Sequence, residues 1–88
     1  LSEAETLLRK SLDIKIQAYG TEQHASVAAS YDSLGHVLQA QGKLGEAETM
    51  LRKSLDISIQ AYGTEQHADV AFSYRILGQV LGAQGKLG

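Results

Sequence analysis

The sequence repeats itself with a period of 43 residues, and this repeat limits the fold more than any other feature. Residues 1–43 align without gaps with residues 44–86, and 34 of the 43 positions are identical. Leu87 and Gly88 match Leu44 and Gly45, which indicates that a third copy begins there. A period of about 20 to 50 residues is typical of stacked repeats, in which each unit buries its apolar face against its neighbours. We therefore expect a single repeat domain over residues 1–88, with repeat units 1–43 and 44–86.

Each unit is predicted to contain two helices that end at glycines. Apolar residues recur at helical spacing over residues 2–19 and 24–41, and again over residues 45–62 and 67–84. Glycines follow each segment and favour the left-handed conformation that terminates helices. The links between segments are short, so consecutive helices should pack antiparallel as hairpins. No alternating pattern typical of β-strands is present. The sequence thus predicts an all-α fold of four helices.

Composition and charge argue against several classes of partner. The net charge is −2, whereas binding of nucleic acid or of an anionic membrane needs a basic patch. No apolar run approaches the about 20 residues of a membrane span, so no membrane partner is expected. Cysteine is absent, which excludes disulfides and thiolate metal sites. Together with the lack of a recognisable signal segment, this composition favours a cytoplasmic location.

The segment "SYDSLGHVLQAQGKLGEAETMLRKSLDI" resembles a tetratricopeptide repeat. The residues that carry this resemblance are Tyr31, Leu34, Gly35, Leu38, Ala47, Leu51 and Ser54. The long period, the "AYG" segment and the His that follows it look like the kinesin light chain and nephrocystin variety, whose repeats have about 42 residues, more than most tetratricopeptide repeats. The resemblance covers the whole chain.

The resemblance implies both an architecture and a function. Helical hairpins of this family stack into a right-handed superhelical solenoid, and the first helix of each hairpin, helix A, lines a concave groove where partner segments lie. Residues 24–41 and 67–84 would be helices A, and residues 2–19 and 45–62 would be helices B, in the order B-A-B-A. The family implies a protein–protein interaction scaffold that binds a peptide or partner helix, rather than an enzyme.

Differences between the two copies point to one side of helix A. Nine positions differ, and five of them lie within one arc of roughly 120° at 100° per residue. These five pairs are Ala29/Phe72, Asp32/Arg75, Ser33/Ile76, His36/Gln79 and Gln39/Gly82. The identical apolar residues of helix A, Val27, Ala28, Tyr31, Leu34, Gly35 and Leu38, lie on another side and form a predicted packing face. We therefore predict that the variable arc faces the groove and binds a partner.

Seven of the ten residues of the arc have an expected role in binding. Phe72 and Ile76 would be apolar anchors on a solvent-facing surface, and Arg75 would supply charge. Polar contacts would come from Asp32, His36, Gln39 and Gln79. An alternative reading is that the arc is merely solvent-facing and has drifted. A second alternative is a structural, self-assembling segment, in which the lone helices at the two ends of the chain stack head to tail without a separate ligand.

The histidines and charged side chains do not form a recognisable catalytic or metal site. His24 and His67 stand where helix A begins in each copy, where we expect them to cap the helix, and no further ligand recurs at suitable spacing. Asp32 and His36 have the spacing to pair, but no nucleophile accompanies them. No enzyme activity, metal or cofactor is therefore expected. Lys15 either extends into solvent or reaches the rim of the groove.

Overall fold

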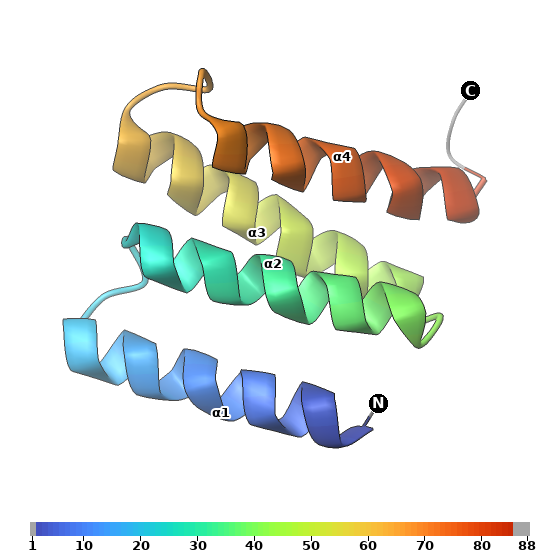
Figure 1. Cartoon of the computed structure of the whole chain (residues 1–88), viewed down its shortest axis with the longest axis horizontal. Helices are drawn as coiled ribbons and strands as arrows, with labels where there is room; N and C mark the ends of the chain where they lie inside the picture. Colours follow the sequence, from blue (N-terminus) through green and yellow to red (C-terminus); the bar gives the residue numbers. More distant parts are fainter. Residues whose placement is uncertain (1, 86–88) are drawn as a thin grey trace.

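The computed structural model describes residues 2–85, which form four α-helices joined by short turns (Figure 1). The helices are α1 (Ser2–Tyr19), α2 (Ala25–Ala40), α3 (Leu44–Tyr62) and α4 (Ala68–Ala83). No strand occurs within residues 2–85, and the predicted all-α class is confirmed. The third copy predicted to start at Leu87 and Gly88 lies outside the described residues.

Glycines in the left-handed conformation end the helices as predicted. Gly63 has φ +71° and donates its N–H to the carbonyl of Ile59 at 2.8 Å. Gly20 has the same φ and donates to Ile16 at 2.9 Å. Because this region of backbone conformation disfavours residues with a Cβ, glycine stops the helix at these positions. The A helices are one residue shorter at each end than predicted, because the flanking histidine and glutamine act as caps.

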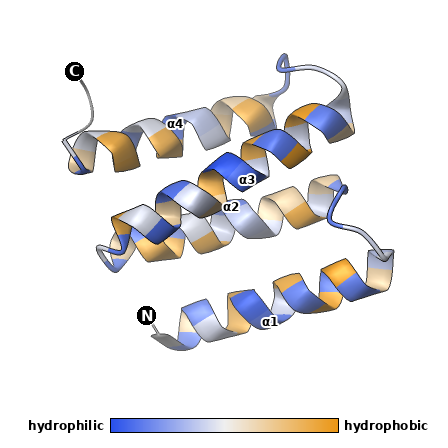
Figure 2. Ribbon diagram, turned by 180° about the vertical axis from the view of Figure 1, so that it is seen from behind, coloured by the Kyte–Doolittle hydropathy of each residue, from blue (hydrophilic) through white to orange (hydrophobic). Residues whose placement is uncertain are grey.

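The four helices pack in chain order as a flat stack. Helix α1 packs on α2, α2 on α3 and α3 on α4, with a smaller contact between α2 and α4. Helices α1 and α4 therefore form the two edges of the molecule (Figure 1), which measures 38 × 33 × 16 Å. Polar and apolar residues alternate along each helix at helical spacing (Figure 2). No helix in the described part of the chain is both long and apolar enough to cross a membrane.

The α2–α3 hairpin is the centre of the core. Leu34 and Leu38 of α2 and Leu51 of α3 are fully buried. Gly35 allows the two helices to approach closely, since a Cβ at this position would lie 2.8 Å from Cγ of Leu51. The packing face predicted for the first helix A is confirmed, because all its residues are buried: Val27, Ala28, Tyr31, Leu34, Gly35 and Leu38.

Candidate partner-binding groove

An open hollow of about 460 Å³ lies across α2, bordered by α1 on one side and by α4 on the other. We call it the α2 hollow, and it is lined by Leu8, Ala25, Ala29, Asp32, Ser33, His36, Val37, Ser58, Asp69 and Phe72. Its walls combine five apolar side chains, small and large, with two carboxylates, two hydroxyls and one imidazole. The hollow can therefore accept a segment that carries both apolar and polar groups.

Half of the ten residues predicted to bind a partner line this hollow. They are Ala29, Asp32, Ser33, His36 and Phe72. The remaining five are not part of its lining: Gln39, Arg75, Ile76, Gln79 and Gly82. The variable arc of α2 is thus gathered around the hollow, whereas that of α4 contributes chiefly Phe72.

Ile76 is buried, so the prediction that it is an exposed anchor was wrong. Its side chain is only 3% exposed and belongs to the hydrophobic core. Ile76 follows Ser73 by three residues and therefore shares its side of α4. Ser73 contacts α2, since its hydroxyl donates to the carboxylate of Asp32. Helix α2 thus covers this edge of the arc, which the spacing within one helix does not show.

Asp32 is also buried, which corrects its expected role as an exposed polar contact. It is 9% exposed, and its two carboxylate oxygens lie 2.7 and 2.8 Å from the Ser73 hydroxyl. Burial raises the pKa of Asp32, against the lowering effect of hydrogen bonds from Ser73 and Ser54, and the nearby Asp69 carboxylate raises it further. No hydrogen bond joins Asp32 to His36 within the described residues. Asp32 instead connects α2 to α4 at the floor of the hollow.

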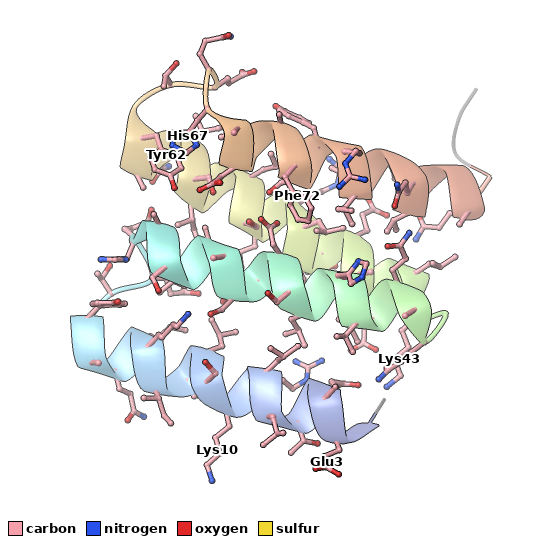
Figure 3. The ribbon with its side chains drawn as sticks, in the orientation of Figure 1. Glu3, Lys10, Lys43, Tyr62, His67 and Phe72 are labelled. Carbon is pink, nitrogen blue, oxygen red and sulfur yellow. The ribbon has the colours of Figure 1, made fainter. Side chains whose placement is uncertain are left out.

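Phe72 is the large apolar residue that the hollow exposes. It is 41% exposed, and its ring projects from α4 toward α2 (Figure 3). The Arg75 guanidinium lies 5.2 Å from the centre of this ring, within the range of a cation–π contact. Gln39 and Gln79 also connect the two helices, since the amide of Gln39 donates to that of Gln79 at 3.4 Å. Phe72 and Arg75 therefore offer an apolar ring and a cation side by side.

Several residues of the hollow were missed by the sequence comparison. Val37 is identical in the second copy, and Leu8 lies on a helix B, so neither belongs to the variable arc of helix A. Ser58 could have been found, because it differs from Lys15 at the equivalent position. Lys15 itself does not extend into solvent, because its ammonium donates to the Ser30 hydroxyl at 2.8 Å and so contacts α2.

The loop histidines cap the A helices, as predicted. Nδ1 of His24 accepts from the N–H of Ser26 at 3.0 Å, and Nδ1 of His67 accepts from the N–H of Asp69 at 3.1 Å. The His67 ring also stacks on Tyr62, with 3.6 Å between ring centres (Figure 3). Within residues 2–85, no group of three or more His, Cys, Asp or Glu is placed to hold a metal ion.

Comparison with known proteins identifies the kind of repeat. The family model of the tetratricopeptide repeat matches residues 1–60 and, in a second overlapping match, residues 26–88. No match to the chain is found among curated proteins or among solved structures. The two matches together cover the chain from end to end, in agreement with the stacked helical hairpins of the fold.

Proposed function

Because this chain belongs to the tetratricopeptide repeat family, whose members are generally protein-interaction scaffolds, we propose that it binds a protein segment in the α2 hollow. The observation that carries this proposal is Phe72, a large apolar side chain that stays 41% exposed at the edge of a hollow. Aromatic and arginine side chains are the usual anchors of protein interfaces, and here Arg75 lies beside the ring. The same proposal has three further parts. The repeat is of the kinesin light chain and nephrocystin variety, residues 1–88 form a single repeat domain, and the chain has no catalytic activity.

The chemistry of the hollow defines the partner segment. Ala25, Ala29 and Val37 provide a shallow apolar surface beside Phe72. Asp69 is an exposed carboxylate at the α4 side of the hollow, and the carboxylate of Asp32 lies nearby. A short helical or extended segment with one apolar side chain against Phe72 and one basic side chain near Asp69 fits this arrangement.

A double substitution of Phe72, which lines the hollow, and Arg75, which lies beside its ring, tests the proposal. We expect Phe72→Ala with Arg75→Glu to lower the affinity for a partner captured by pull-down at least about tenfold, because both the apolar anchor and the cation are lost. Titration calorimetry with the purified partner measures this change. The control is Gln17→Ala, since Gln17 is exposed on α1 and is not part of the hollow. Unchanged affinity in the double variant, or an equal loss in the control, would contradict the groove assignment.

A second candidate function is self-assembly, and the exposed apolar residues of the edge helices favour it. Leu7 and Ile14 of α1 are 59% and 58% exposed, and Tyr74 of α4 is 47% exposed. These residues lie outside the lining of the α2 hollow, so groove binding leaves them unexplained.

A further inference from the structure

The internal duplication shows the same helix faces in two environments. Tyr31 of α2 is 5% exposed against α3, whereas its counterpart Tyr74 of α4 is 47% exposed. Ile57 of α3 is 3% exposed against α2, whereas its counterpart Ile14 of α1 is 58% exposed. The face of α4 that carries Tyr74 and the face of α1 that carries Ile14 therefore correspond to the two surfaces that meet between α2 and α3. We call them the hairpin faces, and they lie at opposite edges of the molecule (Figure 1).

The glycines at the hairpin contact show the same difference. A Cβ at Gly35 would lie 2.8 Å from Leu51, because α3 presses against α2 at this point. A Cβ at Gly78, the equivalent position of α4, would meet nothing within 4 Å. The surface of α4 thus keeps a site for close helix approach that no described helix of the same molecule occupies.

We propose that a second copy of this chain completes both faces, with α1 of one molecule packing on α4 of the next as α3 packs on α2. This inference goes beyond groove binding and does not depend on it. The occupant follows from the sequence: α1 differs from α3 only at Ser2/Gly45, Leu7/Met50 and Lys15/Ser58. The hairpin face of α4 is identical to that of α2, because the differences between these helices lie on the variable arc.

The polar contacts at the edge of the α2–α3 hairpin have equivalents between molecules. The Tyr31 hydroxyl donates to Glu22 at 2.5 Å, and the Lys53 ammonium lies 3.1 Å from the same carboxylate. The counterparts are Tyr74 and Glu65 in one molecule and Lys10 of the next. Lys10 projects away from the body of the molecule at the free edge of α1 (Figure 3), where the next molecule would approach.

One junction of the proposed interface is less favourable than its intramolecular model. Within the chain, Asp32 of α2 accepts from Ser73 of α4. Between molecules, Arg75 of one copy takes the place of Asp32, and Ser30 of the next copy takes the place of Ser73. Lys15 of that next copy already donates to its own Ser30. Two cations therefore approach each other at this junction, which limits the affinity of the contact.

The geometry of the contact also defines the type of assembly. Because α4 of one copy meets α1 of another, the two surfaces differ and each molecule keeps one free face of each kind. Contacts of this heterologous type extend into open chains of molecules unless a rotation closes them. We expect the average mass to rise steadily with concentration instead of stopping at a dimer.

Sedimentation velocity of the 88-residue chain, from micromolar to millimolar concentration, tests the proposal. We expect Ile14→Asp to raise the dissociation constant at least about tenfold, because it places a charge in the apolar contact. The matched control is Gln17→Asp, which adds the same charge on α1. Its counterpart Gln60 stays exposed although α3 is packed on α2, so this change should leave association unaltered. Equal weakening by both variants would overturn the assignment of this face.

A gain of affinity separates this interface from non-specific association. We expect Arg75→Asp to lower the dissociation constant about tenfold, because a carboxylate then faces Ser30 and Lys15 of the next molecule as Asp32 faces Ser73. Circular dichroism shows that each variant is folded. The proposal is overturned if both the unaltered chain and Arg75→Asp stay monomeric at millimolar concentration, or if Arg75→Asp weakens association.

A pair of charge reversals tests the direction of the contact. Glu65→Lys and Lys10→Glu should each reduce self-association, because each places like charges together. An equimolar mixture of the two variants should associate into chains in which the variants alternate, since the substituted α4 end of the first meets the substituted α1 end of the second and their unaltered ends also carry opposite charges. If the mixture associates no better than either variant alone, the head-to-tail pairing is wrong.

Discussion

At the scale of single residues, Gly35 and Gly78 give a matched test of the hairpin contact. Gly35→Ala should destabilise the chain by about 1–3 kcal/mol, because its Cβ would lie 2.8 Å from Leu51 and the helices must move apart. Gly78→Ala meets nothing within 4 Å and should stabilise helix α4 by up to about 1 kcal/mol through helix propensity. Urea denaturation at low protein concentration measures both. Similar effects of the two substitutions would contradict the close approach at Gly35.

Asp32 should make stability depend on pH in a predictable direction. Burial raises its pKa in the folded chain, so the folded state retains this proton to higher pH than the unfolded state does. Ionisation of the buried Asp32 carboxyl therefore destabilises the folded state. This loss of stability is absent below the ordinary carboxyl pKa of about 4 and is complete above the raised pKa. Asp32→Asn keeps an acceptor for Ser73 without the charge. Its unfolding free energy relative to the unaltered chain should therefore rise between pH 4 and pH 7, and a constant difference in chemical denaturation would contradict this account.

At the scale of helices, His24 and His67 determine where the A helices begin. We expect His24→Ala to destabilise the chain by about 0.5–2 kcal/mol, because the N–H of Ser26 loses its acceptor and Tyr19 loses a stacked ring. His24→Asn is the control, since asparagine restores a capping acceptor but not the stack. Thermal unfolding of both variants separates the two effects. If His24→Asn is as damaging as His24→Ala, the cap contributes little and the ring contact dominates.

The same helices show what the sequence could predict and what it could not. Gly20 and Gly63 act through their own backbone, so helix ends were predictable to within about a residue. The hairpin face of α2 was predictable because apolar residues identical in both copies recur on one side. The burial of Ile76 and Asp32 was not, because it depends on how far a neighbouring helix reaches around each of them. A pattern within one helix gives the direction of a side chain and not the position of the next helix.

The same limit applies to the hollow at the scale of the whole molecule. Comparing the copies identified Phe72 and the variable side of α2 as parts of the hollow, since positions outside the helix-packing faces are free to differ. It missed Leu8 because the border of the hollow at α1 depends on how α1 stacks on α2, which a comparison of the A helices does not show. Stacking also explains why equal residues differ in exposure: Leu51 is fully buried in the central hairpin, whereas its counterpart Leu8 is half-buried at an edge.

A stack in which each helix contacts mainly its neighbours should lose structure from its edges inward. Helix α1 packs chiefly on α2 and α4 chiefly on α3, whereas α2 and α3 share the most extensive contact. Amide hydrogens in the middle turns of α2 and α3 should therefore exchange at least about tenfold more slowly than those of α1 in dilute solution. Hydrogen exchange followed by mass spectrometry or NMR measures this order. Raising the concentration should protect α1 and α4 selectively if molecules stack head to tail, whereas Ile14→Asp should remove that gain. Uniform protection across all four helices in dilute solution would instead show that the chain opens as one cooperative unit.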